Sequence, residues 1–108
     1  MRKPTTIKFE HRKIKIKYIS AKQADKKGIY GQVEPAKDLI EIDKTLKPSQ
    51  TLNTIIHECM HLIADHYSWE IPSNHEELVA ETGTNGILDL LSTNPKLLDY
   101  LAFVLKKD

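Results

Sequence analysis

Residues 48–67 read PSQTLNTIIHECMHLIADHY, and this stretch has the pattern of an amphipathic helix. Pro48 and Ser49 supply a helix start, with Ser49 as the expected N-cap. At about 100° per residue, the apolar side chains share one broad arc. They are Leu52, Ile55, Ile56, Cys59, Met60, Leu62, Ile63 and Tyr67. His57 and His61 fall on the other side, so we predict a helix that is buried on one side and carries two histidines on the other.

The two histidines belong to the motif His57-Glu58-Cys59-Met60-His61, which has the form H-E-x-x-H. Histidines at positions i and i+4 of a helix lie on one face, so both imidazoles can reach a single zinc ion. Glu58 is expected beside that metal, where it can accept a proton from zinc-bound water as the general base. Cys59 lies on the apolar arc and is expected in the core. The alternative is a pair of histidines on a solvated helix face that binds no metal.

A catalytic zinc site needs a third protein ligand and leaves a fourth position for water. The segment 75–81, HEELVAE, supplies candidates at the start of a second predicted helix. The loop over residues 69–74 is short, so the two helices should be antiparallel neighbours. Their proximity would bring segment 75–81 close to the H-E-x-x-H motif.

Within that segment we favour Glu76 as the ligand. Val79, Gly83 and Ile87 follow it at helical spacing, on a face expected to point toward the first helix. The other candidates are Glu77 and Glu81, on a more outward face, and then His75 and His66. A purely structural role is also open, because carboxylates near a helix N-terminus complement its dipole.

The remaining pattern predicts an α+β chain. Alternating or β-branched residues indicate strands in the first half, and two further helices follow the motif helix in the second half. The expected strands are 14–19, 28–33 and 39–42, and the expected helices are 48–67, 75–91 and 95–105. We therefore predict a small, about three-stranded N-terminal sheet packed on three helices, in a single domain covering residues 1–108.

Composition narrows the class of protein. The 108 residues are 40% hydrophobic and 29% charged, an ordinary globular mixture. They contain no apolar run of about 18 residues that could span a membrane. The start of the chain lacks the apolar stretch of a signal peptide, and a single cysteine builds no disulfide framework, so we expect a cytoplasmic protein.

The net charge of +1 conceals an asymmetry, because residues 1–27 carry +8 and the remainder carries −7. Lys13, Lys15 and Lys17 alternate with apolar residues along one predicted strand. We favour a solvated edge strand that its lysines protect from aggregation over a nucleic-acid surface. The expected partner is a protein or peptide substrate, without a membrane and without nucleic acid, and the oligomeric state stays open.

An H-E-x-x-H motif followed by a glutamate on a second helix resembles the gluzincin metallopeptidases. The compact layout, a small sheet and then the motif, is similar to the ImmA/IrrE-like metallopeptidases and their small phage and prophage relatives. The segments Glu76-Glu77-Leu78-Val79 and Asn94-Pro95 match helix starts of these small proteins loosely. The similarity spans about residues 28–105, and only His57, Glu58 and His61 match it specifically.

This resemblance implies a zincin-like minimal fold and a zinc-dependent metallopeptidase of phage or bacterial type. It implies zinc on His57, His61 and an acidic residue best matched by Glu76, with Glu58 as general base. It also implies that substrate lies extended along an edge strand, for which residues 39–42 are the match.

Two features depart from the family pattern. The chain is short, and it has no clear tyrosine or histidine for oxyanion stabilisation, for which Tyr67 and His66 are the candidates. The alternative function is a catalytically idle zinc-binding interaction module of a phage or prophage. Structural zinc sites are usually closed by four protein ligands, so a fourth ligand from His75 or His66 would favour that alternative.

Overall fold

The computed structural model describes residues 2–67 and 70–107 and has the predicted α+β composition. It contains a four-stranded mixed sheet and four α-helices. In chain order the elements are β1 (Thr6–Phe9), β2 (Arg12–Ile19), α1 (Ala21–Lys27), β3 (Gly31–Glu34), a 3-10 turn (Pro35–Lys37), β4 (Leu39–Asp43), α2 (Pro48–His66), α3 (Ser73–Ser92) and α4 (Pro95–Lys107).

The strands of the sheet follow the order β1-β2-β4-β3. β1 pairs antiparallel with β2, β2 pairs parallel with β4, and β3 pairs antiparallel with β4. The edges of the sheet are therefore β1 and β3. This order corrects two expectations, because the strand over residues 39–42 and the lysine-bearing strand over residues 14–19 are both internal.

The core forms where one face of the sheet meets α2. Along β2 the isoleucines are buried and the intervening lysines are exposed, as the alternating sequence predicts. Parallel pairing sets Ile16 beside Ile40, and Leu62 of α2 packs against the same cluster. The buried members of this cluster are Ile14, Ile16, Ile40, Ile42, Ile55 and Leu62. Each such side chain contributes about 1.5–3 kcal/mol when fully buried, so this contact fixes how α2 lies on the sheet.

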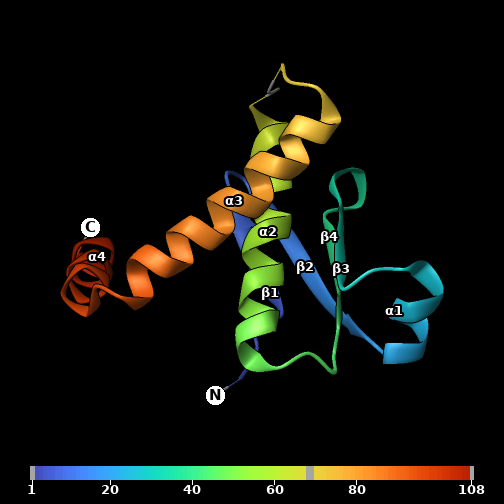
Figure 1. Ribbon diagram of the computed structural model, residues 1–108, viewed down its shortest axis with the longest axis horizontal. Helices are drawn as coiled ribbons and strands as arrows, with labels where there is room; N and C mark the ends of the chain where they lie inside the picture. Colours follow the sequence, from blue (N-terminus) through green and yellow to red (C-terminus); the bar gives the residue numbers. More distant parts are fainter. Residues whose placement is uncertain (1, 68–69, 108) are drawn as a thin grey trace.

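The helices α2, α3 and α4 form successive layers rather than one layer on the sheet (Figure 1). α2 packs against β3 and β4, α3 packs against α2, and α4 packs against α3 at the end far from the sheet. The prediction of three helices packed on a three-stranded sheet is therefore wrong in both its strand number and its packing. Within residues 2–67 and 70–107, no helix combines the length and the apolar character that crossing a membrane requires.

Two elements were missed from the sequence, β1 and α1. β1 has only four residues, and its hairpin turn places Glu10 in the left-handed region at φ 55°, without the glycine or asparagine typical of such turns. α1 carries clearer signals. Ser20 and Gln23 form a capping box, and Gly28 ends the helix at φ 69°.

The helix boundaries differ slightly from those predicted. At the start of α2 the N-cap is Lys47 rather than Ser49, and the Lys47 backbone N–H donates to the Gln50 side chain at 3.0 Å. Pro48 then occupies the first turn, where its missing N–H costs nothing. α3 begins at Ser73 and so shortens the predicted loop, of which Trp69 lies outside the described residues.

On the face of β4 away from the core, Glu41 is almost fully buried beneath α1. Lys27 of α1 donates to its carboxylate at 2.7 Å, and Gln32 donates at 3.2 Å. The hydrogen bond from Lys27 is the main reason why the pKa of Glu41 is lowered. The ionised carboxylate therefore ties α1 to the sheet.

We predict that Lys27→Met destabilises the protein by about 1–2 kcal/mol near neutral pH, because it leaves a buried carboxylate without its cationic partner. A folded-state pKa below the unfolded value means that the wild-type advantage is complete above about pH 4.5 and is lost as the pH falls through the folded pKa. Urea unfolding from about pH 3 to about pH 7 measures this difference. Lys26→Met is the matched control, and a wild-type advantage that does not change with pH would contradict the assignment.

Candidate metal centre

His57 and His61 lie one turn apart on α2 and turn their rings toward α3. Their Nε2 atoms are 3.3 Å apart, and the ring centroids are 5.1 Å apart. Two ligands on a tetrahedral zinc ion, each about 2.05 Å from it, are separated by about 3.3 Å. The two nitrogens therefore stand at the spacing that one shared zinc ion requires.

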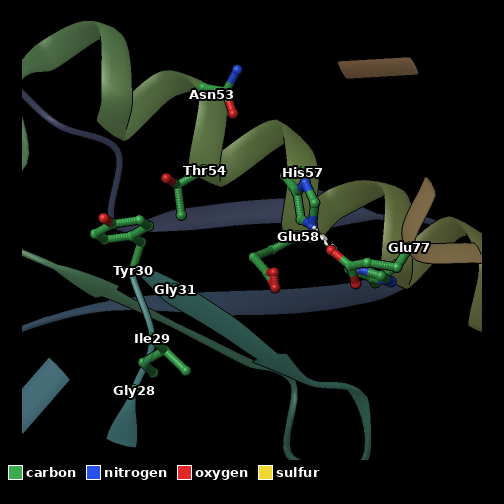
Figure 2. Close-up of a pocket in the computed structure, with 10 residues that line it drawn as sticks. Gly28, Ile29, Tyr30, Gly31, Asn53, Thr54, His57, Glu58 and Glu77 are labelled. Carbon is green, nitrogen blue, oxygen red and sulfur yellow. Dashed lines mark hydrogen bonds and ion pairs between the residues drawn. The ribbon is translucent and has the colours of Figure 1, made fainter. Parts of the chain in front are cut away.

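Glu77 of α3 completes a three-residue group with these histidines. Its Oε1 lies 2.7 Å from Nε2 of His57 (Figure 2). Its Oε2 lies 3.0 Å from Nε2 of His61. Among the described residues, His57, His61 and Glu77 are the group whose ligand atoms are close enough together to share a metal ion. Two imidazoles and one carboxylate form a donor set that suits zinc.

Glu76, the ligand favoured from the sequence, contacts the other nitrogen of His61. Its Oε2 lies 2.7 Å from Nδ1. A carboxylate in this position fixes the ring orientation and keeps the proton on Nδ1, so that Nε2 is left as a donor atom for a metal. The structure thus brings both neighbouring glutamates to the histidines, on different nitrogens.

The buried face of α3 differs from the predicted one. Ala80 and Thr84, which follow Glu77 at helical spacing, are fully buried, whereas Val79 and Ile87 are exposed. Gly83, which belongs to the predicted line, does approach Met60 of α2, so the buried line of α3 lies beside the predicted one. Small side chains let two helices approach closely. The small residues Ala80 and Thr84, at helical spacing from Glu77, are therefore the sequence signal that could have identified Glu77 as facing α2.

Glu58 is 6% exposed and lies between α2 and β3. Burial raises the pKa of its carboxyl, while the nearby His61 and His57 and a hydrogen bond from the Val33 backbone oppose that rise. For His61, burial lowers the pKa, but the hydrogen bond with Glu76 and the nearby carboxylates outweigh it, so the net pKa is raised. Cys59 packs against the core, where burial raises the pKa of its thiol to about 11 and keeps it protonated, as expected for a core residue.

Two cavities meet at the site. One, of about 360 Å³, extends from Glu58 and the histidines past Thr54 to Tyr30, which stands at the end opposite Glu77 in Figure 2. The other, of about 330 Å³, extends along Val33 and Pro35. Both are lined by Glu58 and His61, so one hollow lies on each side of the buried carboxylate, beside residues of β3.

The remaining candidates lie elsewhere in the described structure. His75 and Glu81 are exposed on α3 and do not belong to the three-residue group. Tyr67 donates to Glu10 at 3.2 Å, and His66 lies 3.9 Å from the same carboxylate and packs against Phe9. The two residues considered for oxyanion stabilisation therefore contact the β1–β2 turn.

In comparisons with known proteins, no family model, no curated protein and no solved structure matches this chain.

The wall of the larger cavity depends on Gly31. A Cβ added there would lie 2.5 Å from Cγ2 of Thr54 and 3.1 Å from the Glu41 carbonyl oxygen. The β-branched Thr54 is stiff, and its hydroxyl donates to the Gln50 carbonyl at 2.8 Å, so it has little freedom to move away. The glycine therefore allows β3 to lie close to α2.

We predict that Gly31→Ala destabilises the protein by about 1–3 kcal/mol through overpacking. Thr54→Ser removes the clashing methyl group and keeps the hydroxyl, so the double variant should recover at least half of that loss. Urea unfolding of the wild type, both single variants and the double variant gives the coupling energy directly. Additive effects of the two substitutions would contradict the close contact.

Proposed function

We propose that this protein is a zinc-dependent metallopeptidase that hydrolyses peptide bonds. The observation that carries the proposal is the convergence of His57, His61 and Glu77 at zinc-ligand spacing beside the buried Glu58. The mixed sheet followed by the motif helix also suits the zincin-like minimal fold that the sequence suggests.

In this proposal Nε2 of His57, Nε2 of His61 and the carboxylate of Glu77 hold the zinc ion. Glu76 acts through His61, whose ring it orients. Three protein ligands leave a fourth position for water, which is the arrangement of catalytic rather than structural zinc sites. His66 and His75, the residues considered for closing a four-ligand site, stand outside the group in the described structure.

Zinc, when bound, lowers the pKa of its water toward 7 and polarises the carbonyl of the scissile bond. Glu58 accepts a proton from the attacking water and passes it to the leaving amine nitrogen as the C–N bond breaks. Its low exposure strengthens this role, because burial raises the pKa of the carboxyl toward the range in which it can both accept and release a proton.

The substrate in this proposal is an extended peptide that lies along β3. β3 is an edge strand, so the side of its backbone that faces away from β4 can pair with another strand wherever Glu58 does not already accept from it, and one hollow lies on each side of Glu58. β3 thus takes the role that the family resemblance gave to residues 39–42.

We predict about one zinc ion per chain, measured by elemental analysis after dialysis, with affinity measured by competition with a chromophoric chelator. His57→Ala and Glu77→Gln should each weaken zinc binding at least about 100-fold. Glu76→Gln should weaken it about 10–100-fold, because it loses only the orientation of His61. Glu81→Gln, an exposed carboxylate on the same helix, is the matched control.

If zinc binding survives Glu77→Gln but is abolished by Glu76→Gln, the third zinc ligand is Glu76 and not Glu77. A purified protein without stoichiometric zinc, and unable to take it up, would contradict the metal site itself.

We further predict that Glu58→Gln leaves the zinc content unchanged and lowers kcat/KM by about 10²–10⁴-fold, because it removes the general base alone. Cleavage of a fluorescence-quenched peptide library measures the activity, with Glu81→Gln again as control. A zinc-loaded wild type that cleaves no member of the library would favour the alternative of a catalytically idle zinc-binding module.

A further inference from the structure

The C-terminal part of α3 and the whole of α4 expose an apolar surface. It comprises six side chains that are 41–70% exposed, and we call it the α3–α4 surface: Ile87, Leu90, Leu97, Leu98, Leu101 and Leu105. Single exposed leucines are normal in a folded protein, whereas a group of them on two adjoining helices marks an interaction site.

The exposed leucines of α4 lie on one side of the helix. Leu97, Leu101 and Leu105 follow one another at intervals of four residues, so they form one line along α4. α4 packs against α3, at the end of the molecule that lies away from the sheet in Figure 1. The helix therefore has the stripe of a core-facing helix, and each leucine of that stripe is 41–70% exposed.

The total surface area supports the same conclusion. The chain exposes 8070 Å², whereas a compact monomer of 12.4 kDa exposes about 6,100 Å². Its radius of gyration is 14.6 Å, against about 13 Å for a compact chain of this length. The excess of about 1,900 Å² exceeds the roughly 800 Å² that each partner buries in a standard stable interface.

The character of this surface favours a permanent partner. Its defining residues are all aliphatic, and interfaces of that kind resemble a domain core cut in two, as in obligate homodimers. Such a surface aggregates unless its partner is present whenever the chain is present. A second copy meets this condition, and the near-neutral net charge of +1 means that two copies do not repel each other strongly.

A membrane surface suits these helices less well. Helices that lie on anionic lipid carry clusters of about four to eight lysines or arginines on or beside them. α4 offers Lys96, Lys106 and Lys107, and the acidic Asp99 lies among them. α3 adds acidic residues and contains no lysine or arginine.

We propose that the α3–α4 surface binds a second copy of this chain and forms a two-fold symmetric dimer. The interface lies away from the zinc-site cluster, because Glu76 and Glu77 belong to the opposite end of α3. The proposal is therefore independent of the proposed peptidase activity.

Sedimentation velocity and light scattering on the whole chain test the proposal. At micromolar concentrations the wild type should have twice the 12.4 kDa chain mass. The double variant Leu97→Glu, Leu101→Glu should weaken dimerisation at least about 100-fold, because it buries four uncompensated carboxylates in a symmetric interface. Leu105→Glu is a second, milder variant. Leu52→Glu places the same charge on a similarly exposed leucine of α2 and should leave the dimer intact.

Far-UV circular dichroism and zinc content serve as folding controls, since the substituted leucines lie outside the buried core cluster. A monomeric wild type overturns the proposal, as does a dimer that both variants leave unchanged. A monomeric wild type that binds vesicles of phosphatidylcholine and phosphatidylglycerol, and loses that binding in the double variant, also overturns it and assigns the surface to a membrane.

Discussion

The packing of α2 on the isoleucine face of the sheet is the contact on which the rest of the structure depends. Ile55 and Leu62 enter the cluster formed by β2 and β4, and this sets the rotation of α2 about its own axis. With that rotation fixed, Glu58 faces β3, and His57 and His61 face α3. A helix that buried a different face would separate the three residues of the motif from both neighbours.

The electrostatics of the site follow from the same arrangement. Glu58, Glu76 and Glu77 bring three carboxylates around two imidazoles in a partly buried region. Burial raises the pKa of Glu58, and the surrounding carboxylates outweigh burial and raise the pKa of His61. A raised pKa means that the protonated form is favoured, so both groups favour the addition of positive charge to the site. A divalent cation would supply that charge without a proton, which is the physical reason why the cluster suits a metal better than a solvated surface would.

Features that depend on local spacing could be predicted from the sequence, and those that depend on packing between distant segments could not. The interval between His57 and His61 defines a shared helix face wherever the helix lies, and the alternation along β2 defines its buried isoleucines. The choice between Glu76 and Glu77 depends on how α3 rotates against α2.

That rotation follows the small residues Ala80 and Thr84, whereas the predicted line ran through Val79 and Ile87, which are both exposed. The strand order also had no local signal. β4 pairs with β2 across α1 and β3, so a strand that looked like an edge became internal.

The cluster has one further consequence, because its residues come from two helices rather than from one. α3 packs closely against α2 through small residues, and Gly83 lets the Met60 methyl come within 3.1 Å of where a Cβ would stand. Under the proposed function, an ion shared by His57, His61 and Glu77 would brace the two helices together. Ligand binding of this kind stabilises the folded state by mass action, so proteolytic survival of the chain would follow the free zinc concentration of its surroundings.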